Sequence, residues 1–77
     1  MSEEYVVAID NEETNEEACS ITGRVNGQQC AVVLRNSSFL GLSGKEQKHV
    51  KLVALAKAYK EKAATVVSSA VGEMVKL

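Results

Sequence analysis

Alternating apolar and polar residues on either side of an Asn-Gly pair at positions 26–27 provide the clearest structural signal in the chain. Asn-Gly favours a two-residue β-turn, because both central residues of a type I′ turn need positive φ. With this pair as the loop, Ile21 lies opposite Val32, and the apolar positions of both flanks share one face. The pattern therefore predicts an antiparallel hairpin with strands over about 18–25 and 28–35.

A third strand is expected over about 4–10, near the amino terminus. Tyr5, Val7 and Ile9 recur at every second position there, so they would share one face of a sheet. The next residues, 11–17, are polar and acidic. We expect them to form a mobile loop that connects two neighbouring antiparallel strands.

The second half of the chain has the apolar period of an α-helix. Ser43 and Glu46 have the spacing of a capping box, which predicts that a helix begins after a connector over 36–43. A helix over about 44–75 would present an apolar stripe about 120° wide to a core. The stripe consists of Leu52, Leu55, Ala56, Tyr59, Ala63, Val66, Val67, Ala70 and Met74. The β-branched residues within 65–69 lower helix propensity, so a break or a short strand remains open there.

These elements predict an α+β fold in which a three-stranded antiparallel β-meander packs against one long C-terminal α-helix. The chain of 77 residues has room for a single domain over 1–77. A core of this size contributes only about 3–5 kcal/mol of stability unless a metal, a disulfide or a second copy of the chain adds to it. Of these three contributions, we favour a second copy of the chain.

Metal and disulfide contributions are not expected. Two Cys and one His, with no pair at ligand spacing, are too few for a closed zinc site, and no cofactor is expected. The hairpin register places Cys19 and Cys30 four residues apart along the ladder, a separation of about 13 Å that exceeds the limit of about 7 Å for a disulfide. Both thiols are expected to be free, buried and unreactive.

No targeting or membrane segment is expected. The amino terminus carries acidic residues where a secretory signal would be basic, and no apolar run approaches the roughly 20 residues that span a bilayer. These features predict a cytoplasmic protein.

Charge is distributed unevenly along the chain, although the formal net charge is −1. Residues 1–17 carry a formal charge of −7 and residues 18–77 a formal charge of +6. Such an acidic segment is most often a solvated loop, but it can also dock on a basic partner or fold back on the chain's own lysines. The candidate partner-binding residues are Asp10, Glu12, Glu13, Glu16 and Glu17.

No catalytic arrangement can be assembled from sequence spacing. His49 is the only imidazole and has no recognisable acid or nucleophile as a partner, which favours a surface role. The glycines around Lys45 lack the spacing of a phosphate-binding loop. We therefore expect a protein that is not an enzyme.

The leading functional hypothesis is a small protein-interaction module that acts as a regulator, inhibitor or assembly factor through its surface and its acidic N-terminal loop. The small size and dense local folding signals also suit a viral accessory protein, although no motif identifies one. The alternative is a nucleic-acid-associated protein that uses its lysine-rich helix. The helix lysines are Lys45, Lys48, Lys51, Lys57, Lys60 and Lys62. They spread around the helix without a base-reading motif, which favours the interaction module.

Small residues line the side of the predicted helix opposite its apolar stripe, where a solitary surface helix would usually carry more charge. They would let a second helix approach closely, and a homodimer of two antiparallel helices would add stability that the core lacks. The candidate self-association residues are Val50, Ala54, Ala58, Thr65, Ser68, Gly72 and Val75.

Overall fold

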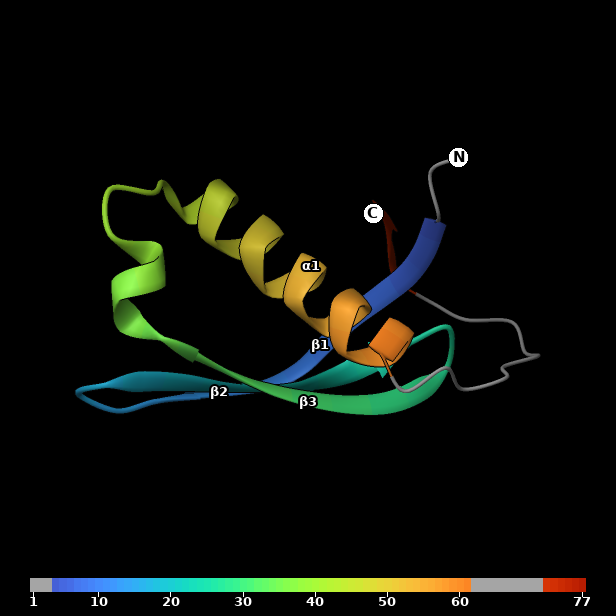
Figure 1. Cartoon of the computed structure of the whole chain (residues 1–77), viewed down its shortest axis with the longest axis horizontal. Coiled ribbons are helices and arrows are strands. Elements are labelled where there is room, and N and C mark those ends of the chain that lie inside the picture. Colours follow the sequence, from blue (N-terminus) through green and yellow to red (C-terminus); the bar gives the residue numbers. More distant parts are fainter. Residues whose placement is uncertain (1–3, 62–71) are drawn as a thin grey trace.

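The computed structural model, which describes residues 4–61 and 72–77, consists of a four-stranded antiparallel sheet with one α-helix across one face (Figure 1). In chain order the elements are β1 (Glu4–Thr14), β2 (Ala18–Val25), β3 (Gln28–Arg35), the 3-10 helix η1 (Asn36–Phe39), α1 (Gly44–Glu61) and β4 (Glu73–Lys76). The strand order in the sheet is β3-β2-β1-β4. The predicted α+β class and the three-stranded meander are confirmed, and the sheet gains a fourth strand.

The predicted hairpin is confirmed in both its turn and its register. Ile21 lies opposite Val32, and the turn residues Asn26 and Gly27 have φ values of 50° and 84°. Positive φ at both positions is what a type I′ turn requires. Asn26 also extends the ladder toward β1, because its backbone N–H donates to the Val6 carbonyl at 2.8 Å and its Oδ1 accepts the Val6 N–H at 2.9 Å.

The mobile loop expected over 11–17 is wrong, because β1 continues through Thr14 and leaves a turn over 15–17. Asn15 organises this turn: its Oδ1 accepts two backbone N–H groups from the far side of the turn, each at 2.8 Å. Asn36 Nδ2 donates to the Asn15 carbonyl at 2.8 Å and so attaches the turn to η1. Backbone pairing with β2 thus orders an acidic segment whose side chains remain largely exposed.

A β-bulge at Asp10 changes which side chains of β1 face the helix. The ladder with β2 passes from Ile9 to Asn11, so Asp10 is the extra residue. Odd-numbered positions of β1 face α1 before the bulge, and even-numbered positions face it afterwards. Glu12 and Thr14 therefore lie on the helix side, each opposite a buried residue of β2.

The start of α1 agrees with the predicted capping box. Ser43 Oγ accepts the Glu46 backbone N–H at 3.2 Å, and the Glu46 carboxylate accepts the Ser43 N–H at 3.3 Å. The members of the predicted apolar stripe that belong to α1 are buried. They are Leu52, Leu55, Ala56 and Tyr59. They pack on a core completed by the sheet residues Tyr5, Val7, Cys19, Ile21, Val25, Cys30 and Val75.

The predicted C-terminal end of the helix is wrong: α1 ends at Glu61 and lies in the middle of the chain, with β4 after it. β4 pairs antiparallel with β1, placing Val75 opposite Tyr5. Val75 is 2% exposed and Met74 is 60% exposed, the reverse of the expected helix, in which Met74 faced the core. The short strand satisfies backbone groups that β1 would otherwise leave unpaired at its edge, and adds Val75 to the core. The remaining stripe positions, Ala63, Val66, Val67 and Ala70, lie outside the described residues.

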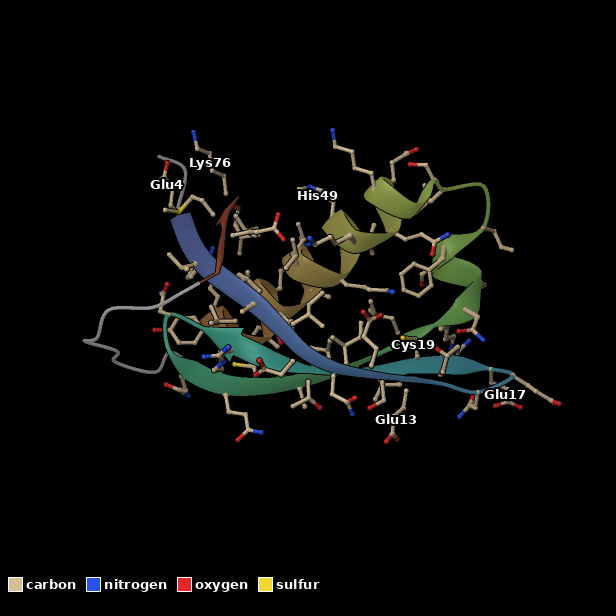
Figure 2. All side chains as sticks on the ribbon, turned by 180° about the vertical axis from the view of Figure 1, so that it is seen from behind. Glu4, Glu13, Glu17, Cys19, His49 and Lys76 are labelled. Atoms are coloured by element: carbon tan, nitrogen blue, oxygen red, sulfur yellow. The ribbon has the colours of Figure 1, made fainter. Side chains whose placement is uncertain are left out.

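The described residues form two layers, with α1 on one side of the sheet (Figure 1). No described element covers the other side, where Val33 is 69% exposed. The first residues of β1 and the last of β4 lie side by side. Figure 2 shows Glu4 and Lys76 at this end of the sheet, where Lys76 Nζ lies 3.5 Å from Glu4 Oε1.

Candidate functional site

Two of the predicted partner-binding carboxylates are engaged within the protein. Asp10 forms two hydrogen bonds with the Arg24 guanidinium, at 3.0 and 3.1 Å, on the sheet side opposite α1. Glu12 forms an ion pair with Lys51 of α1, whose side chain is only 18% exposed. The Lys51 ammonium also lies 5.4 Å from the centre of the Phe39 ring, within range of a cation–π contact. The acidic segment therefore folds back in part on the chain's own helix.

The other predicted acidic residues point to solvent and do not form one cluster. Glu13 projects from the sheet side opposite the helix, whereas Glu17 lies at the tip of the β1–β2 hairpin (Figure 2). Glu16 precedes it in the same turn, and all three residues are exposed. The five predicted residues are thus divided between two internal ion pairs and two separate exposed positions.

The lysines of α1 are also partly engaged. Lys48 Nζ lies 2.7 Å from the Glu73 carboxylate, and Lys51 is paired with β1. Lys45 and Lys57 form no ion pair with another residue in the described part of the chain. The positive charge available to an external partner is therefore smaller than the sequence suggests.

The predicted self-association residues divide between two regions. Val50, Ala54 and Ala58 are half-buried on α1. Gly72 and Val75 do not lie on α1, because Gly72 directly precedes β4 and Val75 lies within it, where Val75 belongs to the core. The last two candidates, Thr65 and Ser68, lie outside the described residues. Self-association through the small residues of α1 therefore stays a prediction, and the extension of the helix to residue 75 is wrong.

An apolar groove of about 430 Å³ runs between α1 and the inner face of β3. Its lining residues are Leu34, His49, Val50, Val53, Ala54 and Lys57. A second hollow of about 380 Å³ adjoins it toward the start of α1, since His49 and Val50 line both. The second hollow adds Leu42, Lys45 and Glu46. Together they form a continuous apolar strip, hereafter the α1–β3 groove, with charged side chains along its margin.

Sequence reasoning identified Val50 and Ala54 but not the other wall of this groove. Leu34 belongs to the apolar face of the hairpin, and Val53 lies outside the stripe that faces the core. Both are only half-buried, because the helix crosses the sheet without covering the margin along β3. The sequence signal for this groove was that the helix carries apolar residues outside the stripe that faces the core.

The chemistry of the groove suits apolar contact. His49 is exposed on α1 (Figure 2), and no cysteine lines the groove, since the Cys19 and Cys30 side chains are both buried in the core. Within residues 4–61 and 72–77, no three His, Cys, Asp or Glu side chains form a group that could hold a metal ion. The site presents aliphatic walls, with His49, Lys45 and Lys57 as polar groups at its margin.

The α1–β3 groove is a continuous apolar feature on the surface of the part of the chain that the structure describes. No helix within this part is sufficiently long and apolar to cross a membrane. Comparisons of the chain with protein-family models, with curated proteins and with solved structures find no match.

Proposed function

We propose that this protein is a small non-enzymatic protein-interaction module, a regulator, inhibitor or assembly factor, and that the α1–β3 groove is its contact surface. The observation that carries the proposal is the alignment of Val50, Val53 and Leu34 along one half-exposed strip. Contiguous exposed apolar surface of this kind marks interaction sites in soluble proteins. The polar margin around an apolar centre is also the usual anatomy of a protein interface.

The exposed acidic residues have a supporting role in this proposal. Asp10 and Glu12 already have internal partners, so releasing them to an external one would cost those contacts. Glu13, Glu16 and Glu17 remain exposed and would attract a basic partner over a longer range. Their effect is expected mainly on the association rate and its salt dependence.

Nucleic-acid binding through α1 remains the alternative, and the ion pairs weigh against it. Lys48 and Lys51 are paired with carboxylates, whereas Lys45 and Lys57 form no ion pair with another residue in the described region. Even if Lys60 is included, three phosphate contacts would make the logarithm of affinity fall with a slope of only about −3 against the logarithm of salt concentration. A steep salt dependence of duplex binding would favour the alternative over the interaction module.

The proposal is tested by affinity retention from cells that naturally make the protein, followed by mass spectrometry. Val50→Glu places a charge in the groove, whereas Met74→Glu places the same charge on the exposed outer face of β4. We expect partner proteins to be retained by the wild type and by Met74→Glu but lost with Val50→Glu. Retention that is unchanged by Val50→Glu would show that the groove is not the contact surface.

A further inference from the structure

We infer that the α1–β3 groove is completed by a second copy of this chain, whose β3 pairs antiparallel with β3 of the first copy about Val32. This inference rests on the proposed function, since it names the partner of the same groove. It differs from the helix-to-helix dimer expected from the sequence, because backbone pairing at the edge of the sheet would hold the two copies together.

The outer edge of β3 has backbone groups directed away from the sheet. Asn36 donates its backbone N–H to the Glu17 carbonyl at 2.9 Å, and hydrogen-bonded pairs recur at every second residue of an antiparallel ladder. In the observed register, Val32 therefore directs its N–H and C=O at β2. Ala31 and Val33 direct theirs outward, where no strand of the described chain pairs with them.

β3 also lacks the features by which edge strands usually prevent pairing. It has eight residues, Gln28–Arg35, and pairs with β2 without a bulge. It contains no lysine and no proline, and its single charged residue, Arg35, lies at the end of the strand. Natural edge strands commonly use charges, proline, bulges or shortness to block association. An edge without them is a template for another strand.

The sequence of β3 is compatible with pairing to itself. Antiparallel pairing about Val32 places Ala31 opposite Val33 and Gln29 opposite Arg35, so no like charges meet. Ala31 and Val33 become hydrogen-bonded partners and use the outward groups of both strands. Because directly opposed residues point to the same face of a sheet, both copies of α1 would lie on one side of an eight-stranded sheet.

The same arrangement brings the two grooves together. Leu34 is at once an inner-face residue of β3 and a wall of the groove, so strand pairing sets the apolar flank of one α1 beside that of its copy. A standard interface buries about 800 Å² per partner, whereas the whole described surface is 5250 Å². One edge strand and one groove form an interface at or below that size, so a dissociation constant in the micromolar range is expected.

Cross-linking tests the register directly. Val32 would face its own copy in a non-hydrogen-bonded pair, in which the Cα atoms lie about 4.5 Å apart, within the range of a disulfide. Two copies of residue 33 would be separated by two residues along the strands, about 8 Å, beyond that range.

We expect Val32→Cys to form a disulfide-linked dimer under mild oxidation. Val33→Cys should not, although Val33 is 69% exposed and a thiol there is more accessible. The wild type, whose two cysteines are buried, is the background control.

Sedimentation equilibrium tests the strand pairing without a cross-link. Ala31→Pro removes an outward N–H that the protomer does not use, whereas Ala31→Val keeps it and is the matched control. We expect Ala31→Pro to weaken dimerisation at least tenfold and Ala31→Val to leave it within about twofold. Circular dichroism verifies that the proline variant is folded. If it is not, the comparison of Val32→Cys with Val33→Cys tests the strand pairing instead.

The outcomes separate this inference from the proposed function. A dimer that survives Ala31→Pro but dissociates with Val50→Glu would overturn the strand pairing while keeping the groove as the contact surface. Equal cross-linking of Val33→Cys and Val32→Cys would overturn the register. A wild type that is monomeric up to about 300 µM would overturn the second copy as the occupant. The retention experiment with Val50→Glu would then test the groove with a different protein as its partner.

Discussion

Gly23→Ala tests a close approach of β2 to both β1 and α1. Gly23 is buried in β2 beside the Asp10 bulge. A Cβ added there would lie 2.2 Å from the Ala8 carbonyl oxygen and 2.9 Å from a methyl group of Leu55. The Leu55 methyl can rotate away, but the carbonyl belongs to the backbone of β1. The contact with Ala8 therefore determines the energetic cost.

The magnitude of this cost follows from the required displacement. The contact must open by about 0.8 Å, from 2.2 Å to the 3.0 Å below which Cβ contacts essentially do not occur. Overpacking of this kind costs about 1–3 kcal/mol, and a lengthened hydrogen bond between the strands adds about 1 kcal/mol. A loss of about 3 kcal/mol is comparable with the whole stability of about 3–5 kcal/mol expected for such a domain. We therefore expect the variant to retain only about 0–2 kcal/mol of stability, so that an appreciable fraction unfolds under mild conditions.

Urea unfolding monitored by circular dichroism measures the effect. With an m-value of about 1 kcal/mol per M, the midpoint of Gly23→Ala is expected to fall by about 3 M. Gly44→Ala is the matched control, because a Cβ at the start of α1 meets no atom within 4 Å. That change should raise stability by about 0.4–1 kcal/mol through the unfolded state. If the two variants had equal midpoints, the close approach of β1 and β2 at Gly23 would be refuted.

Three further experiments test the start of α1, the presence of β4, and the contact between the acidic segment and α1. Ser43→Ala should lower the free energy of unfolding by about 1 kcal/mol in urea, because it removes the N-cap acceptor; an unchanged midpoint would place the helix start elsewhere. Val75→Ala should lower it by about 1–3 kcal/mol, since Val75 is buried in β4, whereas a gain in melting temperature would indicate a helix there. A double-mutant cycle of Glu12→Gln and Lys51→Met should report a coupling of about 0.2–1 kcal/mol that diminishes in high salt. The same cycle with Glu13→Gln should report none, because Glu13 faces the other side of the sheet.

The features that were correctly predicted from the sequence depend on neighbours within a few residues. The hairpin register follows from Asn26 and Gly27, whose turn geometry sets which residues of the two flanks are opposed. The start of α1 follows from Ser43 and Glu46, which complete each other's hydrogen bonds across three positions. In each case the determining contacts lie within one turn, so the local residue pattern is sufficient.

The candidate site could be predicted from the sequence only in part. The sequence pattern identified Val50 and Ala54 as self-association candidates on the side of the helix opposite its apolar stripe. Only the crossing of α1 over the sheet decides that this flank lies beside Leu34 and leaves a groove there. The position of a helix on a sheet depends on side chains distant in the sequence, because the packing of both surfaces must be satisfied at once.

The remaining differences arose where a segment suits two structures and a distant partner chooses between them. The chain around Met74 and Val75 fits either a helix stripe or a strand, and the unpaired edge of β1 selects the strand, because pairing satisfies backbone groups as well as burying Val75. Glu12 suits a polar loop by composition, yet β2 draws it into a strand and the bulge turns it toward Lys51. The sequence by itself determined the turn, the cap and the local alternation, which depend on short-range geometry. Tertiary structure decided the fourth strand, the face of each acidic residue and the groove, because these depend on hydrogen bonds and packing between segments far apart in the chain.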